Sequence, residues 1–499
     1  MCLVNVMTLR VYNTLTKKKE AFIPLEEGKV GMYCCGITAY DVCHIGHARS
    51  AIVFDVIFRY LRYRGYNVTY VKNFTDVDDK IIGKANAEGT DIAAIADRYI
   101  REHNDDMDAL GLARPTVTPR ATENIKGMIR MIDRLIEEGF AYVVDGDVFY
   151  SVDAFRGYGT LAGRSLDDMI AGARIEVDVK KKNPFDFVLW KGSKEGEPWW
   201  DSPWGRGRPG WHIECSVMSQ RYLGETFDIH GGGEDLIFPH HENEIAQAEG
   251  ASGKLFARYW IHNGFVKVNS EKMSKSLGNF FTIKEVLAQY HPEVLRLFIL
   301  QSHYKSVIDF SDAALREARS GMERFYGTLA TIEETLARNT AYKDISEKDI
   351  FGIHEEYLKK ISLLPERFVE AMDDDFNTAR AIGYIFDTVR ILNSYMADKA
   401  FLPEAEPLFV LNAAKGYLRE VGKVLGLFLD DPAAYFERDR DRETGKRALD
   451  REEIEQLIER RSEARRMKDW KKADRLRDEL KEKGIVLKDS PDGTTWTVE

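Results

Sequence analysis

The alternation of apolar strand-like runs with amphipathic helices over the first 110 residues constrains the fold more than any other feature of the sequence. Residues 30–35 predict a buried strand, and apolar residues at helical spacing between positions 52 and 61 predict a helix. Residues 67–74 predict a second strand and residues 91–110 a second helix. A strand–helix–strand unit implies a parallel sheet, which binds ligands beyond the carboxyl ends of its strands. We therefore expect an α/β domain with its site in the loop after the first strand.

An insertion interrupts this pattern between residues 115 and 209. It predicts a helix over 122–138, a tight hairpin over 141–150 around an Asp-Gly pair, and then a stretch rich in Trp, Gly and Pro. The α/β pattern resumes with a strand at 226–230 and a helix beginning near Pro239. The sheet domain is thus expected to be split into two halves.

The rest of the sequence predicts mainly helices. Ser311 can cap a helix that runs toward residue 338, and amphipathic segments follow up to residue 429. We interpret residues 436–451 as a linker or exposed turn. Two short charged helices, 451–467 and 469–483, precede a hairpin at the end of the chain.

Composition excludes several classes of protein. With 44% hydrophobic and 31% charged residues among 499, the chain fits a globular protein and not a disordered or fibrous one. No apolar run is long enough to span a membrane and residues 1–9 lack a signal pattern, so we expect a cytoplasmic protein. An odd number of cysteines argues against a disulfide scaffold: Cys2, Cys34, Cys35, Cys43 and Cys215. The net charge of -11 weighs, at first, against a nucleic-acid partner.

The tetrad His44-Ile45-Gly46-His47 lies in the loop between the first predicted strand and its helix. Free N–H groups and the dipole of a helix N-terminus favour phosphate there, and Gly46 permits its close approach. Taken alone, the tetrad also fits a loop with a capping histidine. Its position at the carboxyl end of a parallel strand favours the phosphate site.

A second candidate phosphate-binding segment is Lys272-Met273-Ser274-Lys275-Ser276. Two lysines flanked by hydroxyls, with Lys267 nearby and Gly278 just beyond, can form a mobile phosphate clamp. The alternative is an exposed basic loop without function.

Candidate metal ligands come from three separate segments. His240 and Glu244 are four residues apart in a predicted helix and share one face, whereas His241 projects elsewhere. Together with Cys35 and Cys215 they offer two thiolates, one imidazole and one carboxylate, which can hold Zn²⁺. A surface hydrogen bond between the histidine and the glutamate remains the alternative.

The tetrad and the lysine segment, in this order, resemble the signature pair of class I aminoacyl-tRNA synthetases. More closely, the chain resembles the cysteinyl-tRNA synthetase family over residues 9–496. The matching runs are residues 32–38, 73–80, 210–215, 227–233, 238–244 and 372–378. One departure is Cys34, where the family usually has another residue. Adjacent strand residues face opposite sides, so only one of the two can reach the metal. The residue next to Gly36 is the one that matches the family, so the resemblance implies Cys35 as the ligand and Cys34 as core; Cys43 is better explained as a buried small side chain.

This resemblance implies a Rossmann-like parallel-sheet catalytic domain split by an insertion, followed by helical domains and a small C-terminal α+β anticodon-binding domain. The expected divisions are catalytic halves at 1–114 and 210–302, a connective insertion at 115–209, a stem-contact helical region at 303–350, a helical bundle at 351–435 and the anticodon-binding domain at 436–499. The family is usually monomeric.

The resemblance also implies the reaction. Cysteine would be activated by ATP, with Mg²⁺, to cysteinyl-adenylate and then transferred to the 3′-terminal ribose of tRNA(Cys). The implied zinc ligands are Cys35, Cys215, His240 and Glu244, and the implied cysteine contacts are Gly36, Thr75, Trp211, His230 and Asp235. The implied catalytic and ATP-binding residues are His44, Gly46, His47, Lys272 and Lys275. A hydrophobic pocket separates near-isosteres by only about 1–3 kcal/mol, whereas zinc prefers a thiolate to a hydroxyl.

A basic segment near the carboxyl end changes the inference from net charge. Residues 460–477 contain nine Lys or Arg against three acidic residues, a local charge of +6, with Trp470 in their midst. Basic residues and an exposed aromatic ring are typical of single-stranded RNA recognition, although such runs are often only solvated helix faces. The resemblance implies anticodon contacts from Arg466, Trp470, Asp474 and Asp489.

Three alternatives remain at this point. The cysteine:glucosaminyl-inositol ligase of mycothiol synthesis resembles the same catalytic core but lacks the C-terminal RNA-binding region. A zinc hydrolase would leave the lysine segment and the histidine tetrad unexplained. A non-catalytic RNA-binding relative would not need intact signature motifs.

Overall fold

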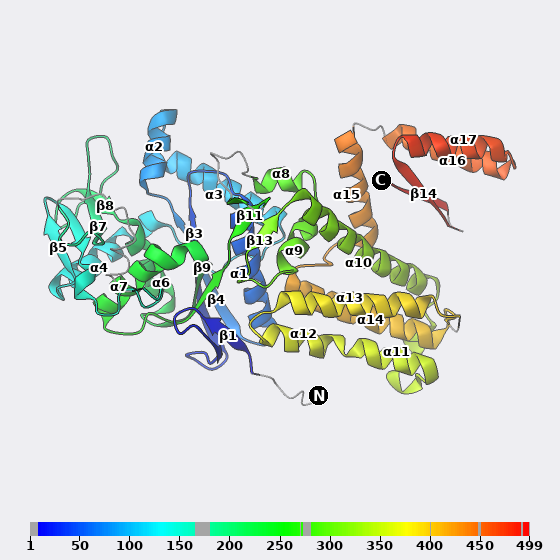
Figure 1. The fold of residues 1–499 in the computed structure, drawn as a ribbon, viewed down its shortest axis with the longest axis horizontal. Helices are drawn as coiled ribbons and strands as arrows, with labels where there is room; N and C mark the ends of the chain where they lie inside the picture. The colour runs from blue at the N-terminus through cyan, green and yellow to red at the C-terminus, as the bar shows by residue number, and fades with distance from the viewer. Residues whose placement is uncertain are drawn as a thin grey trace.

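A four-stranded parallel sheet lies at the centre of the computed structural model (Figure 1), which describes residues 8–164, 180–269, 271–272, 281–399, 401–447, 451–490 and 493–498. The sheet order is β10-β9-β3-β4, with strands β3 (Lys29–Thr38), β4 (Asn67–Thr75), β9 (Phe227–Gly233) and β10 (Ala257–Asn263). Strand β3 pairs in parallel with both β4 and β9. The two predicted halves therefore form one sheet, as expected.

Helices cover both faces of this sheet, because alternate residues of its strands are apolar on both sides. Met32 and Cys34 of β3 pack in one core with α1 (Ile45–Tyr63) and α3 (Ile92–Ala109), whereas Tyr33 packs in the other. That second core includes the helices α6 (Trp211–Leu223) and α7 (Glu242–Ser252). A short helix, α2 (Asp79–Glu88), and an N-terminal hairpin of β1 (Arg10–Asn13) and β2 (Lys18–Ala21) flank the sheet.

The insertion forms its own antiparallel sheet beside the central one (Figure 1). Its elements are α4 (Ile125–Glu137), β5 (Ala141–Val144), β6 (Asp147–Tyr150), β7 (Phe187–Gly192) and β8 (Gly207–Pro209). Asp145 and Gly146 both have positive φ, of 50° and 84°, which is the backbone that a tight Asp-Gly hairpin requires. The hairpin predicted here is confirmed.

The chain after β10 continues through a small three-stranded sheet into helices. Its elements are β11 (Val266–Val268), β12 (Glu271–Lys272), β13 (Ile308–Phe310), α8 (Ile283–Leu287) and α9 (Pro292–Leu300). The long helices that follow are α10 (Asp312–Arg338), α11 (Gly352–Ser362), α12 (Leu364–Asp373), α13 (Thr378–Met396) and α14 (Ala405–Leu425). Ser311 caps α10, as predicted, by accepting a hydrogen bond from the N–H of Ala314.

The last part of the chain begins with a helix packed on α10 and then extends away from the helical bundle (Figure 1). It comprises α15 (Pro432–Arg447), α16 (Arg451–Arg466), α17 (Trp470–Glu482) and a hairpin of β14 (Ile485–Ser490) and β15 (Gly493–Val498). The prediction of a linker over residues 436–451 is wrong, because α15 occupies most of it and Asp439 forms an ion pair with Arg319 of α10 at 2.7 Å. No helix of the described residues is long and apolar enough to cross a membrane.

Candidate active site

A cavity of about 760 Å³ opens where the parallel strands end. Most of the residues predicted for catalysis and cysteine binding line it: Cys35, Gly36, His44, Gly46, His47, Trp211 and Asp235. They come from the end of β3, the N-terminus of α1, the start of α6 and the turn after β9, so the fold brings distant motifs together. Lys72, Lys80 and Lys267 also line the cavity and make it suitable for an anionic ligand.

The two histidines of the tetrad form the N-terminal cap of α1. His44 has an extended backbone, and its Nδ1 accepts a hydrogen bond from the N–H of Gly46 at 3.0 Å. Nδ1 of His47 accepts from the N–H of His44 at 3.3 Å, and the two rings stack at 3.8 Å. Burial lowers the pKa of His44 to about 4 and that of His47 well below its ordinary value. Both imidazoles are therefore neutral near pH 7 and, with Nδ1 accepting, carry their proton on Nε2.

Four potential metal ligands meet beside the cavity, which Cys35 lines. Cys35 of β3 lies with its Sγ 3.7 Å from Sγ of Cys215 in α6 and 3.4 Å from Oε1 of Glu244. Nε2 of His240 lies 3.0 Å from the same carboxylate oxygen. The four donor atoms all lie within 4.8 Å of one another. Trp211 covers this group on the cavity side, since its ring stacks on His240 at 4.0 Å.

Electrostatics inside this group ionise Glu244 and Cys215. Burial raises the pKa of Cys35, whereas the charge of Glu244 raises the pKa of His240 to about 10 against the effect of burial. Burial alone would raise the pKa of Glu244, but His230 and His240 hold it well below its ordinary value. The thiol of Cys35 donates a hydrogen bond to Cys215 and so lowers the pKa of Cys215 to about 6, against the opposing effect of burial. A carboxylate, a thiolate and an imidazole that can lose its proton are the donor types that zinc prefers.

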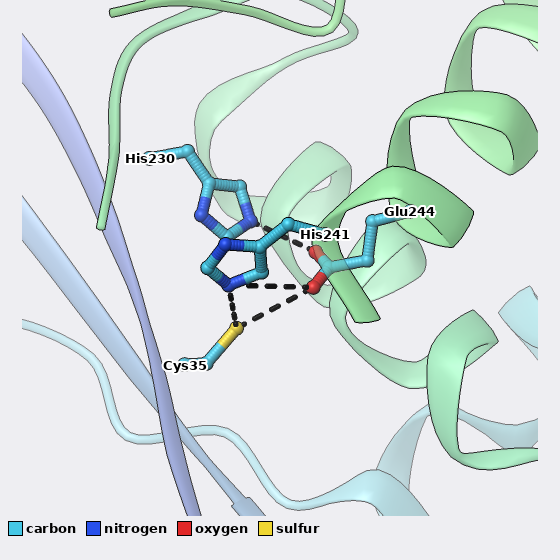
Figure 2. A group of neighbouring side chains, drawn as sticks. All are labelled: Cys35, His230, His241 and Glu244. Carbon is cyan, nitrogen blue, oxygen red and sulfur yellow. Dashed lines mark hydrogen bonds and ion pairs between the residues drawn. The ribbon is translucent and has the colours of Figure 1, made fainter. Parts of the chain in front are cut away.

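A second group overlaps the first, and Figure 2 shows its four side chains converging. It keeps Cys35 and Glu244 and adds His241, whose Nε2 lies 3.3 Å from Sγ of Cys35, and His230, whose Nε2 lies 2.8 Å from Oε2 of Glu244. The prediction that His241 projects elsewhere is wrong. His240 and His241 precede Glu244 by four and three residues, spacings that share one helix face, so both reach the cluster. Regular helix begins at Glu242, after a five-residue π turn (Ile237–His241).

Two predicted cysteine contacts lie beneath the cavity surface. Thr75 is only 2% exposed, and its hydroxyl donates to the buried carboxylate of Glu214 at 2.6 Å. His230 is fully buried and stacks on Trp260 at 4.3 Å. Neither residue lines the cavity, so both reach it through their neighbours.

Gly36 lines the cavity, and Lys272 is connected to it through the neighbouring strand. A Cβ on Gly36 would lie 1.5 Å from the backbone oxygen of Asn73, so only glycine fits where β3 meets β4. The backbone of Lys272 pairs with Lys267, which lines the cavity. Lys275 lies outside the described residues.

The predicted anticodon residues separate into two kinds. Arg466, Trp470 and Asp474 are exposed, with Trp470 59% exposed at the start of α17. Asp489 instead forms ion pairs with Arg461 at 2.8 Å and Arg465 at 2.7 Å, which tie α16 to the terminal hairpin. The Arg461 guanidinium holds the pKa of Asp489 well below its usual range.

Comparisons with known proteins agree with this architecture. Residues 21–320 match the family model described as "tRNA synthetases class I (C) catalytic domain", and residues 367–429 match the DALR domain. Residues 451–496 match the "Cysteinyl-tRNA ligase anticodon binding domain".

Relatives of known name match over nearly the whole chain. The chain is 59% identical to the cysteine–tRNA ligase of Geobacter metallireducens and 58% identical to that of Geobacter sulfurreducens, over 99% of this chain and 100% of each relative. Among solved structures, the methionyl-tRNA synthetase of Mycobacterium tuberculosis with methionyl-adenylate shares the fold, with a TM-score of 0.63 and 16% identity over 80% of this chain and 91% of that one. The chain belongs to the cysteinyl-tRNA ligase family of class I aminoacyl-tRNA synthetases.

Proposed function

We propose that the chain is a cysteine–tRNA ligase that activates L-cysteine with ATP and transfers it to the 3′-terminal ribose of tRNA(Cys). The observation that carries this proposal is the cluster of Cys35, Cys215, His240 and Glu244, whose member Cys35 lines the same cavity as the His44–His47 pair. Relatives of this name at 59% and 58% identity support the same activity. The proposed residues all belong to one chain, so a monomer suffices, and the tRNA partner places the reaction in the cytoplasm.

We propose that this cluster holds one Zn²⁺. Two thiolates at about 2.3 Å from a tetrahedral zinc ion lie about 3.8 Å apart, and the observed separation of Sγ atoms is 3.7 Å. The overlapping set with His230 and His241 offers one thiol instead of two and is less suited to zinc. His230 then orients the ligand, since it contacts the other oxygen of Glu244. When bound, zinc supplies a soft Lewis acid that prefers the thiolate of cysteine to the hydroxyl of serine.

The remaining steps use the chain's own side chains. The cysteine carboxylate attacks the α-phosphorus of ATP and pyrophosphate leaves. His44 and His47, neutral and protonated on Nε2, donate hydrogen bonds to the reacting phosphate. Lys272 and Lys275, with the Mg²⁺ that accompanies ATP, are proposed to neutralise the departing pyrophosphate.

The contacts to cysteine and tRNA complete the proposal. Trp211 walls the cavity and Asp235, which lines it, accepts the substrate ammonium. Arg466, Trp470 and Asp474 are proposed to contact the anticodon, whereas Asp489 holds the arginines of α16 in place. We also propose that the chain divides into the two catalytic halves, the connective insertion, the stem-contact region, the helical bundle and the C-terminal anticodon-binding domain described above.

Two assays test the function. Cysteine-dependent exchange of pyrophosphate into ATP reports adenylate formation, and charging of a tRNA mixture with labelled cysteine identifies the acceptor. We expect exchange with cysteine and acylation of tRNA(Cys). Exchange followed by acylation of an amino sugar, and not of tRNA, would favour the mycothiol ligase, which the match over residues 451–496 disfavours. An absence of exchange would reject both.

A further inference from the structure

Arg49 is a buried cation that none of the proposed steps uses. It lies two residues after His47 in α1 and is only 1% exposed. Its guanidinium donates hydrogen bonds to three backbone carbonyl oxygens, those of Phe265 at 2.5 Å, Tyr304 at 3.0 Å and Ser306. Burial lowers the pKa of Arg49 to about 10, against the charge of Glu234, so the side chain stays protonated at pH 7.

The three carbonyls belong to a crossing of two chain segments, residues 264–266 and 304–306. Phe265 connects β10 to β11, and residues 264–267 line the same cavity as the histidine tetrad. Tyr304 and Ser306 precede β13, which pairs in parallel with β11. Strand β11 continues into β12, where the lysine segment begins.

The two segments of the crossing pack so tightly that a shift of one moves the other. The N–H of Gly264 donates to the carbonyl of Tyr304 at 2.9 Å, so this oxygen accepts from both the backbone and Arg49. A Cβ on Gly264 would lie 2.5 Å from the oxygen of Lys305 and 2.8 Å from that of Ser306. No side chain larger than hydrogen fits between the two segments without moving them.

We propose that Arg49 is a positioning residue that sets the distance between the two walls of the ATP cavity, the His44–His47 wall and the crossing from which the lysine segment extends. This inference rests on the proposed function. The rigid guanidinium fork can reach three acceptors at once, which a lysine ammonium, a point charge on a flexible stem, does not reproduce. A displacement of about 1 Å in an active site can reduce the rate by about 100-fold.

The test measures cysteine-dependent pyrophosphate exchange and, separately, cysteine binding to the zinc-loaded protein by calorimetry. Arg49→Lys keeps the charge, and we expect kcat/KM for ATP to fall at least about tenfold while the cysteine Kd changes by less than about twofold. Arg296→Lys is the matched control. Arg296 is also 1% exposed; it forms an ion pair with Asp55 of α1 at 2.5 Å and donates to the carbonyls of Leu425 and Leu110, none of which lines the cavity. Its exchange kinetics should stay within about twofold of the wild type.

A second variant, Gly264→Ala, perturbs the crossing without replacing the arginine. It should also lower kcat/KM for ATP while leaving the cysteine Kd unchanged. This variant provides the test if Arg49→Lys does not fold. The inference is overturned if folded Arg49→Lys or Gly264→Ala shows wild-type kinetics with ATP, if either weakens cysteine binding as much as it impairs ATP use, or if Arg296→Lys shows the same loss. Failure of the wild-type protein to catalyse exchange would instead reject the proposed function.

Discussion

Replacing Glu244 with glutamine tests the proposed metal site at its most connected ligand. Glu244 is fully buried, with Oε1 3.0 Å from Nε2 of His240 and 3.4 Å from Sγ of Cys35, and Oε2 2.8 Å from Nε2 of His230. Glutamine keeps the shape, removes the charge and turns one acceptor oxygen into a donor. One histidine contact and the negative ligand are lost together.

The expected loss follows from these contacts. A hydrogen bond to a charged group contributes about 1.5–3 kcal/mol. Loss of a hydrogen bond that orients a metal ligand, such as that of His230 to Glu244, lowers metal affinity by about 10- to 100-fold. Loss of the negative ligand adds to this, so we expect the zinc affinity to fall by at least this factor. Competition with a chromophoric chelator measures this affinity, and the zinc content after dialysis provides an independent value.

Glu242→Gln is the matched control for this prediction. Glu242 is equally buried, but its two oxygens accept from the backbone N–H groups of Gly159 and Ala162 at 2.8 and 2.9 Å. Its replacement leaves one of these donors unpaired, which should lower the free energy of unfolding by about 1–3 kcal/mol without changing zinc affinity. Equal loss of zinc affinity in both variants, or none in Glu244→Gln, would refute the assignment of the carboxylate as a ligand.

Three further predictions concern protonation and RNA binding. Because the pKa of His44 is about 4 when folded and 6.5 when exposed, the unfolded state binds more protons between these values, and the free energy of unfolding should fall as pH drops through this window. His44→Gln should weaken that dependence in denaturant titrations at pH 7 and pH 5, and an identical slope would contradict the assignment. Trp470→Ala should leave pyrophosphate exchange intact and raise the KM for tRNA about 5- to 100-fold, since stacking on one base contributes about 1–3 kcal/mol; unchanged charging would exclude stacking. Asp489→Asn should release Arg461 and Arg465 and speed amide hydrogen exchange in the terminal hairpin, whereas wild-type exchange there would show that the ion pairs do not hold it.

The parallel sheet could be predicted because its strands are short apolar runs bounded by glycine, and each carries its own local signal. Helix α15 could not, because its sequence is strongly charged and its contacts outside the helix, such as the ion pair of Asp439 with Arg319 and the stacking of Tyr435 on Tyr326, join residues far apart in the chain. Local patterns carry no information about such partners. The Arg49 contacts could not be predicted for the same reason, because their acceptors are backbone carbonyl groups, which every residue has.

The candidate site, too, could be predicted only in part. Cys35, Cys215, His240 and Glu244 meet as the family resemblance implies, although no local pattern links β3 to α6 or α7. The prediction for His241 counted only the four-residue spacing, although residues three apart also share a helix face, so His241 lies near Glu244 and reaches Cys35. Helical spacing alone therefore does not separate the two histidines.

The most direct test of the account is the ratio of cysteine- to serine-dependent pyrophosphate exchange in the wild type, in Cys215→Ser and in Cys34→Ser. Cys34 is a buried neighbour of the cluster whose pKa burial raises to about 12, so it serves as the control thiol. If zinc held by Cys215 selects the substrate thiolate, the wild type and Cys34→Ser will use serine orders of magnitude more slowly than cysteine, and Cys215→Ser will lose much of that preference. Wild-type selectivity in Cys215→Ser would contradict the account.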